Sequence, residues 1–90
     1  MHYFKLFESQ GCELCAERCY DSEDGEMVRI IINTPSVRLC LKLIYNDPSR
    51  TEEELTALRD NYFDAYDQAQ ADAHISKTLA TLNESVHDQE

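Results

Sequence analysis

The hydrophobic periodicity of the chain changes once, at the Asn46-Asp47-Pro48 turn, and this change constrains the fold more than any other feature. Before the turn, apolar residues alternate with polar ones or form short unbroken runs, as they do in β-strands. After the turn, apolar residues recur every three or four positions, as they do along one side of an α-helix. The change predicts an α+β fold in which an antiparallel sheet of three to four strands is covered on one face by a C-terminal helix or a broken helix pair. We expect one domain, with a β-meander in residues 1–46 and a helical region in residues 47–90.

The first half of the chain divides into four apolar segments separated by turn sequences. Gly, Ser, Asn, Asp and Pro cluster between the segments and predict hairpin connections. The second segment also fits a short helix, because Cys12, Cys15 and Cys19 fall at helical spacing. The hairpin-like loop from Asp21 to Gly25 favours a strand. The predicted strands are Tyr3–Phe7, Cys12–Tyr20, Met27–Asn33 and Val37–Tyr45.

Alternation within these strands predicts which face of the sheet is buried. In the second strand Leu14, Ala16 and Tyr20 share one parity. In the fourth strand the core face is expected to carry Val37, Leu39, Leu41 and Leu43. The polar face is expected to place acidic and basic side chains on neighbouring strands, where they attract modestly. The residues of that layer are Glu13, Glu17, Arg29, Arg38 and Lys42.

The helical region is predicted to begin at Thr51, which forms a capping-box pattern with Glu54. A stripe running from Leu55 and Leu58 to Tyr66 should pack on the sheet, leaving Phe63 outside it. A second stripe, rotated well away from the first, contains Ile75, Leu79, Leu82 and Val86. One straight helix cannot bury both stripes. We therefore expect a break between Gln70 and Ser76, or else a homodimer formed through the second stripe.

Negative charge dominates the surface expected from this sequence. The chain has 18 acidic and 8 basic residues, and 11 of the acidic ones follow residue 46. Four of them lie opposite the first stripe and form a predicted acidic ridge, made of Glu53, Asp60, Asp64 and Asp67. A second acidic group on the hairpin loop includes Asp21, Glu23 and Asp24. Like charges four residues apart weaken a helix slightly, so their retention suggests that the ridge binds a partner, although a simple solubilising role fits equally well.

Four cysteines are the sharpest local signal for chemistry. Cys12, Cys15, Cys19 and Cys40 have the chemistry of zinc ligands, but only one CxxC pair is present. Strand geometry also sends successive side chains to opposite faces. Reduced thiols that pack as small apolar groups are the preferred interpretation, and a zinc-stabilised module is the alternative.

Known catalytic motifs are missing from the sequence. It contains no phosphate-binding glycine loop, nucleophile elbow or HExxH motif. His2, His74 and His87 are interpreted as ordinary surface residues. We therefore expect no enzymatic activity and no cofactor. The N-terminal residues predict neither a signal peptide nor a membrane span, which favours the cytoplasm of the cell or of a host.

A folded acidic surface selects basic partners and repels nucleic acid. The expected function is to inhibit or regulate a nucleic-acid-binding protein or complex by occupying its basic surface as a nucleic-acid mimic. Phe63, off the first stripe, and Tyr66, at its edge, are the candidate aromatic anchors beside the charges. In size, charge and lack of enzyme motifs the chain resembles, as a class, the small acidic anti-CRISPR and anti-restriction proteins of phages and mobile elements. The alternative is a small adaptor that docks through the Ile75–Val86 stripe.

Overall fold

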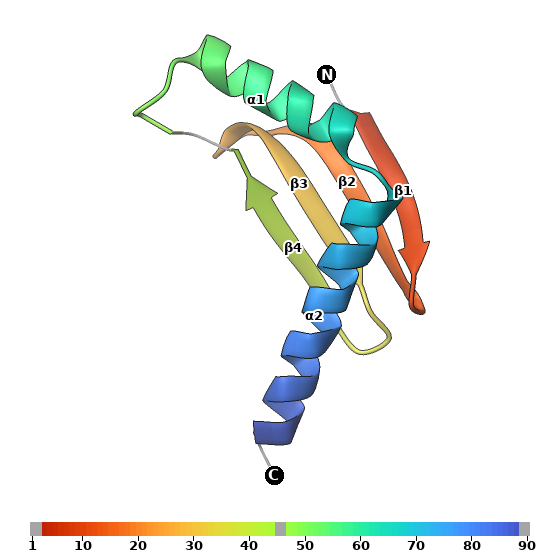
Figure 1. Cartoon of the computed structure of the whole chain (residues 1–90). Coiled ribbons are helices and arrows are strands. Elements are labelled where there is room, and N and C mark those ends of the chain that lie inside the picture. Colours follow the sequence, from red (N-terminus) through yellow and green to blue (C-terminus); the bar gives the residue numbers. More distant parts are fainter. Residues whose placement is uncertain (1–2, 45–46, 89–90) are drawn as a thin grey trace.

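The protein forms a four-stranded antiparallel meander followed by two helices (Figure 1). The computed structural model describes the backbone of residues 3–44 and 47–88 and, in these ranges, the side chains up to Asn83. The sheet order is β1-β2-β3-β4, which confirms the predicted α+β arrangement. The elements are β1 (Tyr3–Ser9), β2 (Cys12–Asp21), β3 (Gly25–Asn33), β4 (Arg38–Leu43), α1 (Glu52–Ala65) and α2 (Gln68–Asp88).

Local turn chemistry explains the sheet register. Gln10 and Gly11 connect β1 to β2 with positive φ angles of 54° and 76°, the pattern of a type I′ hairpin turn. Between β2 and β3, the Asp21 carboxylate accepts N–H bonds from Glu23 and Asp24 at 2.7 and 3.2 Å. Gly25 then adopts φ 76°. The segment from Cys12 is therefore a strand, as preferred over the helical alternative.

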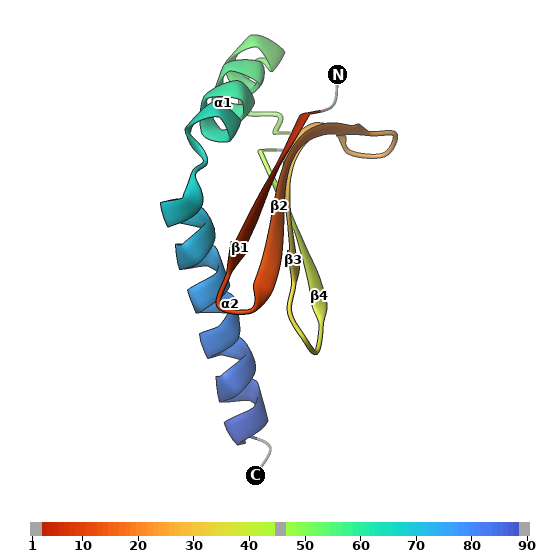
Figure 2. The same ribbon diagram turned by 90° about the vertical axis from the view of Figure 1, so that its right-hand side faces the viewer.

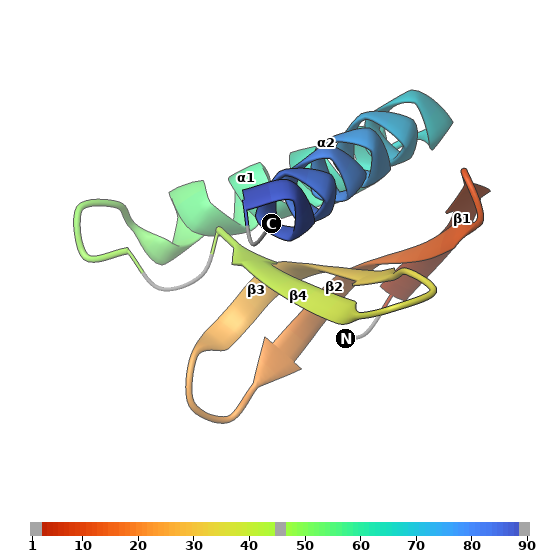
Figure 3. The same ribbon diagram turned by 90° about the horizontal axis from the view of Figure 1, so that it is seen from below.

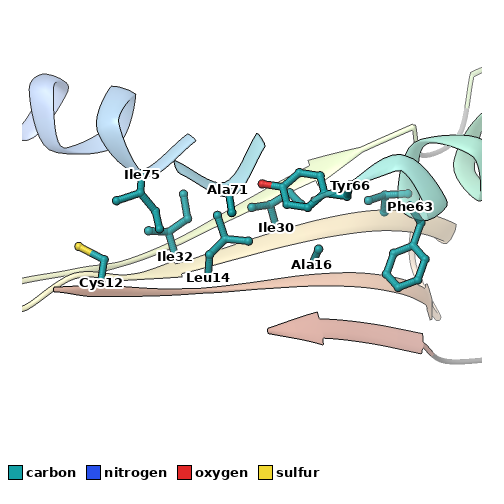
Figure 4. Packing of buried hydrophobic residues seen from close by; sticks show 10 residues of the cluster. Cys12, Leu14, Ala16, Ile30, Ile32, Phe63, Tyr66, Ala71 and Ile75 are labelled. Atoms are coloured by element: carbon teal, nitrogen blue, oxygen red, sulfur yellow. The ribbon is translucent and has the colours of Figure 1, made fainter. Parts of the chain in front are cut away.

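Both helices lie on the same face of the sheet (Figure 2). Leu14, Ile30 and Ile32 of the sheet are almost completely buried beneath them. Phe63 and Ile75 close the core from the helical side, as the close view in Figure 4 shows. The core therefore occupies the space between one sheet face and two successive helices. No helix in the described ranges is long and apolar enough to cross a membrane.

The buried side of α1 is rotated from the side that its leucines indicate. Leu55, Arg59 and Phe63 are buried at successive four-residue steps, whereas Leu58 remains 39% exposed. The predictions that Leu58 is in the core and that Phe63 is outside it are wrong. The buried side carries Arg59, whose Nε donates to the Ile44 carbonyl at 2.7 Å and whose Nη1 donates to Glu52 at 2.7 Å. These two hydrogen bonds offset the cost of removing the charged guanidinium group from water.

The helical region is interrupted at Tyr66 and Asp67, earlier than the predicted interval of 70–76, which lies within α2. Tyr66 takes an extended conformation and ends α1. Lys5 of β1 then donates to the carbonyls of Phe63, Asp64 and Tyr66 at 2.7, 3.1 and 3.2 Å. This ammonium group satisfies and electrostatically stabilises the carboxyl end of α1, which has no basic residue in its own last turn.

The first helical turn confirms the predicted cap at Thr51. Its hydroxyl accepts the Glu54 N–H bond at 3.1 Å, and α1 starts at the next residue, Glu52. The break then allows each helix to turn its own buried side toward the sheet. Ile75 is completely buried, and Leu79 packs against the same core. Ile75 therefore packs within the chain, whereas Leu79 and Leu82 of the second stripe are half-buried and the side chain of Val86 lies outside the described ones.

The core face predicted for β4 is largely uncovered. Val37, Leu39 and Leu41 are 38%, 37% and 42% exposed, and only Leu43 packs against the core. The helices make their main contacts with β1, β2 and β3. Viewed from below, α2 crosses above the sheet (Figure 3). The register places the predicted residues of β4 on one face, but two helices of this placement do not cover the fourth strand. In β2 the predicted alternation holds for Leu14 and Ala16 but not for Tyr20, which is 66% exposed, or for Glu17 of the polar face, which is buried.

Candidate partner-binding surface

The acidic ridge is shorter than the sequence predicts, because two of its four members have structural bonds. Asp60 accepts from Nε of Arg18 at 3.0 Å, and Arg18 also pairs with Glu26. Asp67 lies in the break, where its carboxylate accepts the Gln70 N–H bond at 3.0 Å and caps α2. These bonds stabilise the native arrangement, so neither carboxylate is a freely available recognition group.

The other two ridge members, Glu53 and Asp64, are exposed on α1. Their carboxylates form no hydrogen bond or ion pair within the described parts of the chain. Helical geometry places residues eleven positions apart on nearly the same side, since three turns of helix contain about eleven residues. Glu53 and Asp64 therefore share one solvent-facing direction, with the half-exposed carboxylate of Asp60 beside them. The two residues with unpaired carboxylates, Glu53 and Asp64, are named the α1 acidic face.

Phe63 does not belong to this surface. It is only 7% exposed, its ring lies 6.4 Å from that of Tyr3, and the Lys5 ammonium lies 4.8 Å above it. Its role is to pack α1 onto β1. The predicted position of Phe63 beside the exposed charges is therefore wrong, because the buried side of α1 carries Arg59 and Phe63, which the apolar pattern did not indicate.

The hairpin acids lie near the start of α1. Ser22 to Glu26 share a shallow depression of about 270 Å³ with Glu52 and Arg59. Asp24 pairs with Lys42 at 2.7 Å, and the Glu23 and Asp24 N–H groups lower the pKa of the Asp21 carboxyl. Of the predicted hairpin group, Glu23 alone is exposed and without a side-chain bond in the described structure. The fold thus brings two acidic segments together but neutralises much of their charge.

A signal for Asp67 was present in the sequence. Asp67 followed three residues later by Gln70 is the pattern of a helix N-cap, like Thr51 and Glu54 before it. This N-cap pattern predicts that a new helix starts after Asp67. It also indicates that the Asp67 carboxylate caps this helix and is not part of the exposed ridge. The Asp60 contact had no such signal, because its partner Arg18 is 42 residues away.

The four cysteines do not converge. Cys12 is buried in the core beneath the helices, whereas Cys15 and Cys19 lie on the opposite sheet face. Cys40 also lies on that face, but Ile31 stands between it and Cys15 in the register. No group of three or more possible metal ligands occurs among the described residues. Burial raises the pKa of the Cys15 and Cys19 thiols, which disfavours the thiolate form that binds zinc.

His74 is half-buried, in contrast to the surface position expected for it. Its Nδ1 lies 2.6 Å from the Tyr66 hydroxyl, and the two rings stack. Burial lowers the pKa of His74 and raises that of Tyr66, so both groups are neutral and a hydrogen bond joins them, with the donor set by the imidazole tautomer. The pair links the interhelical break to α2. His2 and the side chain of His87 lie outside the described structure.

This contact predicts a pH dependence of stability. A histidine with a lowered folded pKa binds fewer protons in the folded state, so its contribution is complete above the ordinary value of 6.5 and declines as the pH falls below it. Urea unfolding between about pH 7 and pH 5 should therefore show a decline that His74→Gln flattens. Equal pH slopes for the two proteins would contradict the assignment.

Comparisons with protein-family models, with curated proteins and with solved structures find no match to this chain.

Proposed function

We propose that this protein is a non-enzymatic acidic binding protein that uses the α1 acidic face to occupy the basic surface of a nucleic-acid-binding partner. The supporting observation is the distribution of unpaired charge. Six of the eight basic side chains are bound internally, to carboxylates or, for Lys5, to backbone carbonyls. The only basic residue within α1, Arg59, is buried. The outer side of α1 therefore offers carboxylates without neutralising cations in the described structure.

This charge distribution suits a partner that normally holds phosphates. Lysine and arginine side chains in a nucleic-acid groove gain affinity by releasing counterions, and carboxylates can satisfy the same side chains. Complementary charge mainly accelerates association and sets specificity. Inhibition of the type produced by anti-CRISPR or anti-restriction proteins is the finer form of this proposal, with the host cytoplasm as its location.

Removing the two unpaired carboxylates of α1 should weaken partner binding. We expect Glu53→Gln with Asp64→Asn to reduce affinity about tenfold, mainly through slower association, and to reduce the dependence of affinity on salt. Asp60 is left unchanged because its bond to Arg18 would confound the result. The measurement is association kinetics with a basic protein captured from nuclease-treated lysate, at low and high salt.

A matched control comes from the far end of the molecule. Glu8 and Glu13 are exposed and stand opposite each other beside the β1–β2 turn, far from α1 in Figure 1. Glu8→Gln with Glu13→Gln removes the same number of charges and should change affinity less than about twofold. If both double variants weaken partner binding equally, the effect comes from the net charge of the protein and not from the α1 acidic face. No weakening by either would leave α1 as a solvated face.

A further inference from the structure

The outer edge of β4 is an open end of the sheet. β4 pairs with β3 through one edge, and no backbone group of β4 pairs on the other side within the described residues. At the opposite end of the sheet, the Gln68 side chain donates to the Glu8 carbonyl of β1 at 3.1 Å. Exposed edge strands readily accept another strand, and proteins usually protect them. In the described structure the outer edge of β4 has no covering bond of this kind, and its charged side chains are Arg38 and Lys42.

An apolar groove accompanies this edge. β4 and α2 enclose a groove of about 330 Å³, to which Leu39, Leu41 and Leu82 contribute apolar surface. Leu39 and Leu41 retain 37% and 42% exposure because the helices contact mainly the other strands. An added strand beside β4 would bury these leucines, since alternate side chains of neighbouring strands face the same side of a sheet.

Charge at the groove indicates the chemistry of the occupant. Of the eight basic side chains, Arg38 and Lys77 alone form no hydrogen bond or ion pair within the described structure. Lys77 lines the groove, and Arg38 begins β4 with its side chain on the opposite sheet face. Both faces of the β4 edge therefore carry an unpaired cation, although the chain as a whole is strongly acidic. A complementary segment needs acidic residues.

We propose that the β4 edge and its groove bind an extended segment of a protein partner, in which apolar and acidic residues alternate, as a fifth strand. The apolar residues of the bound segment pack on Leu39 and Leu41. Its acidic residues on the opposite face of the sheet pair with Arg38, and an acidic residue at the rim of the groove pairs with Lys77. Backbone bonds to β4 supply affinity, and the alternating side chains supply specificity. A second copy fits less well, because β4 paired with itself about Cys40 would oppose Arg38 to Lys42.

The test uses the full chain and a displayed library of random peptides of about ten residues, long enough to span β4. The enriched peptides should alternate apolar and acidic residues. Leu41→Lys and, separately, Lys77→Glu should each weaken their binding roughly tenfold. Leu58→Lys is the matched control for the first change, because Leu58 is 39% exposed on α1. Arg50→Glu is the control for Lys77→Glu, because it makes the same change of charge outside the groove.

Hydrogen exchange measured by NMR provides the structural readout. Bound peptide should slow hydrogen exchange of the β4 backbone amides. If Leu41→Lys fails to fold, the loss of peptide binding in Lys77→Glu still tests the proposal. The proposal is overturned if no acidic peptide is enriched, or if binding leaves β4 exchange unchanged, as for a docked helix. It is also overturned by a dimer in sedimentation that Leu41→Lys dissociates. Selection of basic peptides at α1 would instead support the proposed function alone.

Discussion

Replacing Arg59 with alanine is expected to destabilise the domain by about 3 kcal/mol, a large part of the stability of a small protein. Arg59 is 1% exposed and is the largest fully buried side chain among the described ones. Truncation leaves a cavity and removes the donor to the Ile44 carbonyl. Ile44 has φ 52°, a conformation unfavourable for a β-branched residue, and the Arg59 bond helps to hold it.

Two further variants separate these contributions. Arg59→Met retains much of the volume but no hydrogen bond, so its loss of stability should be smaller than that of Arg59→Ala. Glu52→Gln should cost less than about 1 kcal/mol, because the Glu52 side chain is 69% exposed and the ion pair is screened by water. Urea unfolding measures all three. A loss below about 1 kcal/mol for Arg59→Ala would show that the side chain does not determine how α1 packs.

Ile75→Ala is expected to lower stability by about 2–5 kcal/mol, whereas Leu58→Ala should lower it by less than about 1 kcal/mol. Ile75 is fully buried against the sheet, and Leu58 is 39% exposed. The hydrophobic pattern alone predicts a core position for Leu58 and allows an intermolecular one for Ile75. Thermal or urea unfolding of the two variants distinguishes the arrangements. Similar losses for both, or a larger loss for Leu58→Ala, would contradict the observed helix rotation.

Strand pairing was largely predictable because its signals are local. The Ser9-Gln10-Gly11 turn and the Asp21–Gly25 loop each define a hairpin through residues that tolerate or require positive φ. Alternation then determines which side chains share a face. Within the predicted layer of opposite charges on neighbouring strands, Glu17 and Arg29 form an ion pair at 2.9 Å. These features depend on neighbours in sequence or on adjacent strands joined by short turns.

The candidate surface was less predictable because its members have long-range partners. Asp60 and Arg18 are 42 residues apart, and Lys5 reaches the Phe63 carbonyl across 58 residues. A helical wheel treats each charged residue as facing solvent, yet Arg59 faces the core and Asp60 turns toward β2. Of the predicted ridge, Glu53 and Asp64 retain free carboxylates in the described structure.

The sequence by itself determined the change from strands to helices, the hairpin turns, the helix start at Thr51 and the impossibility of burying both apolar stripes on one straight helix. Tertiary structure alone decided where the helices break, which side of α1 is buried, which carboxylates remain free and which strand stays uncovered. The physical reason is the range of the interactions. Periodicity and turn conformation act over a few residues, whereas a buried arginine or an edge strand depends on groups that meet only after the chain has folded.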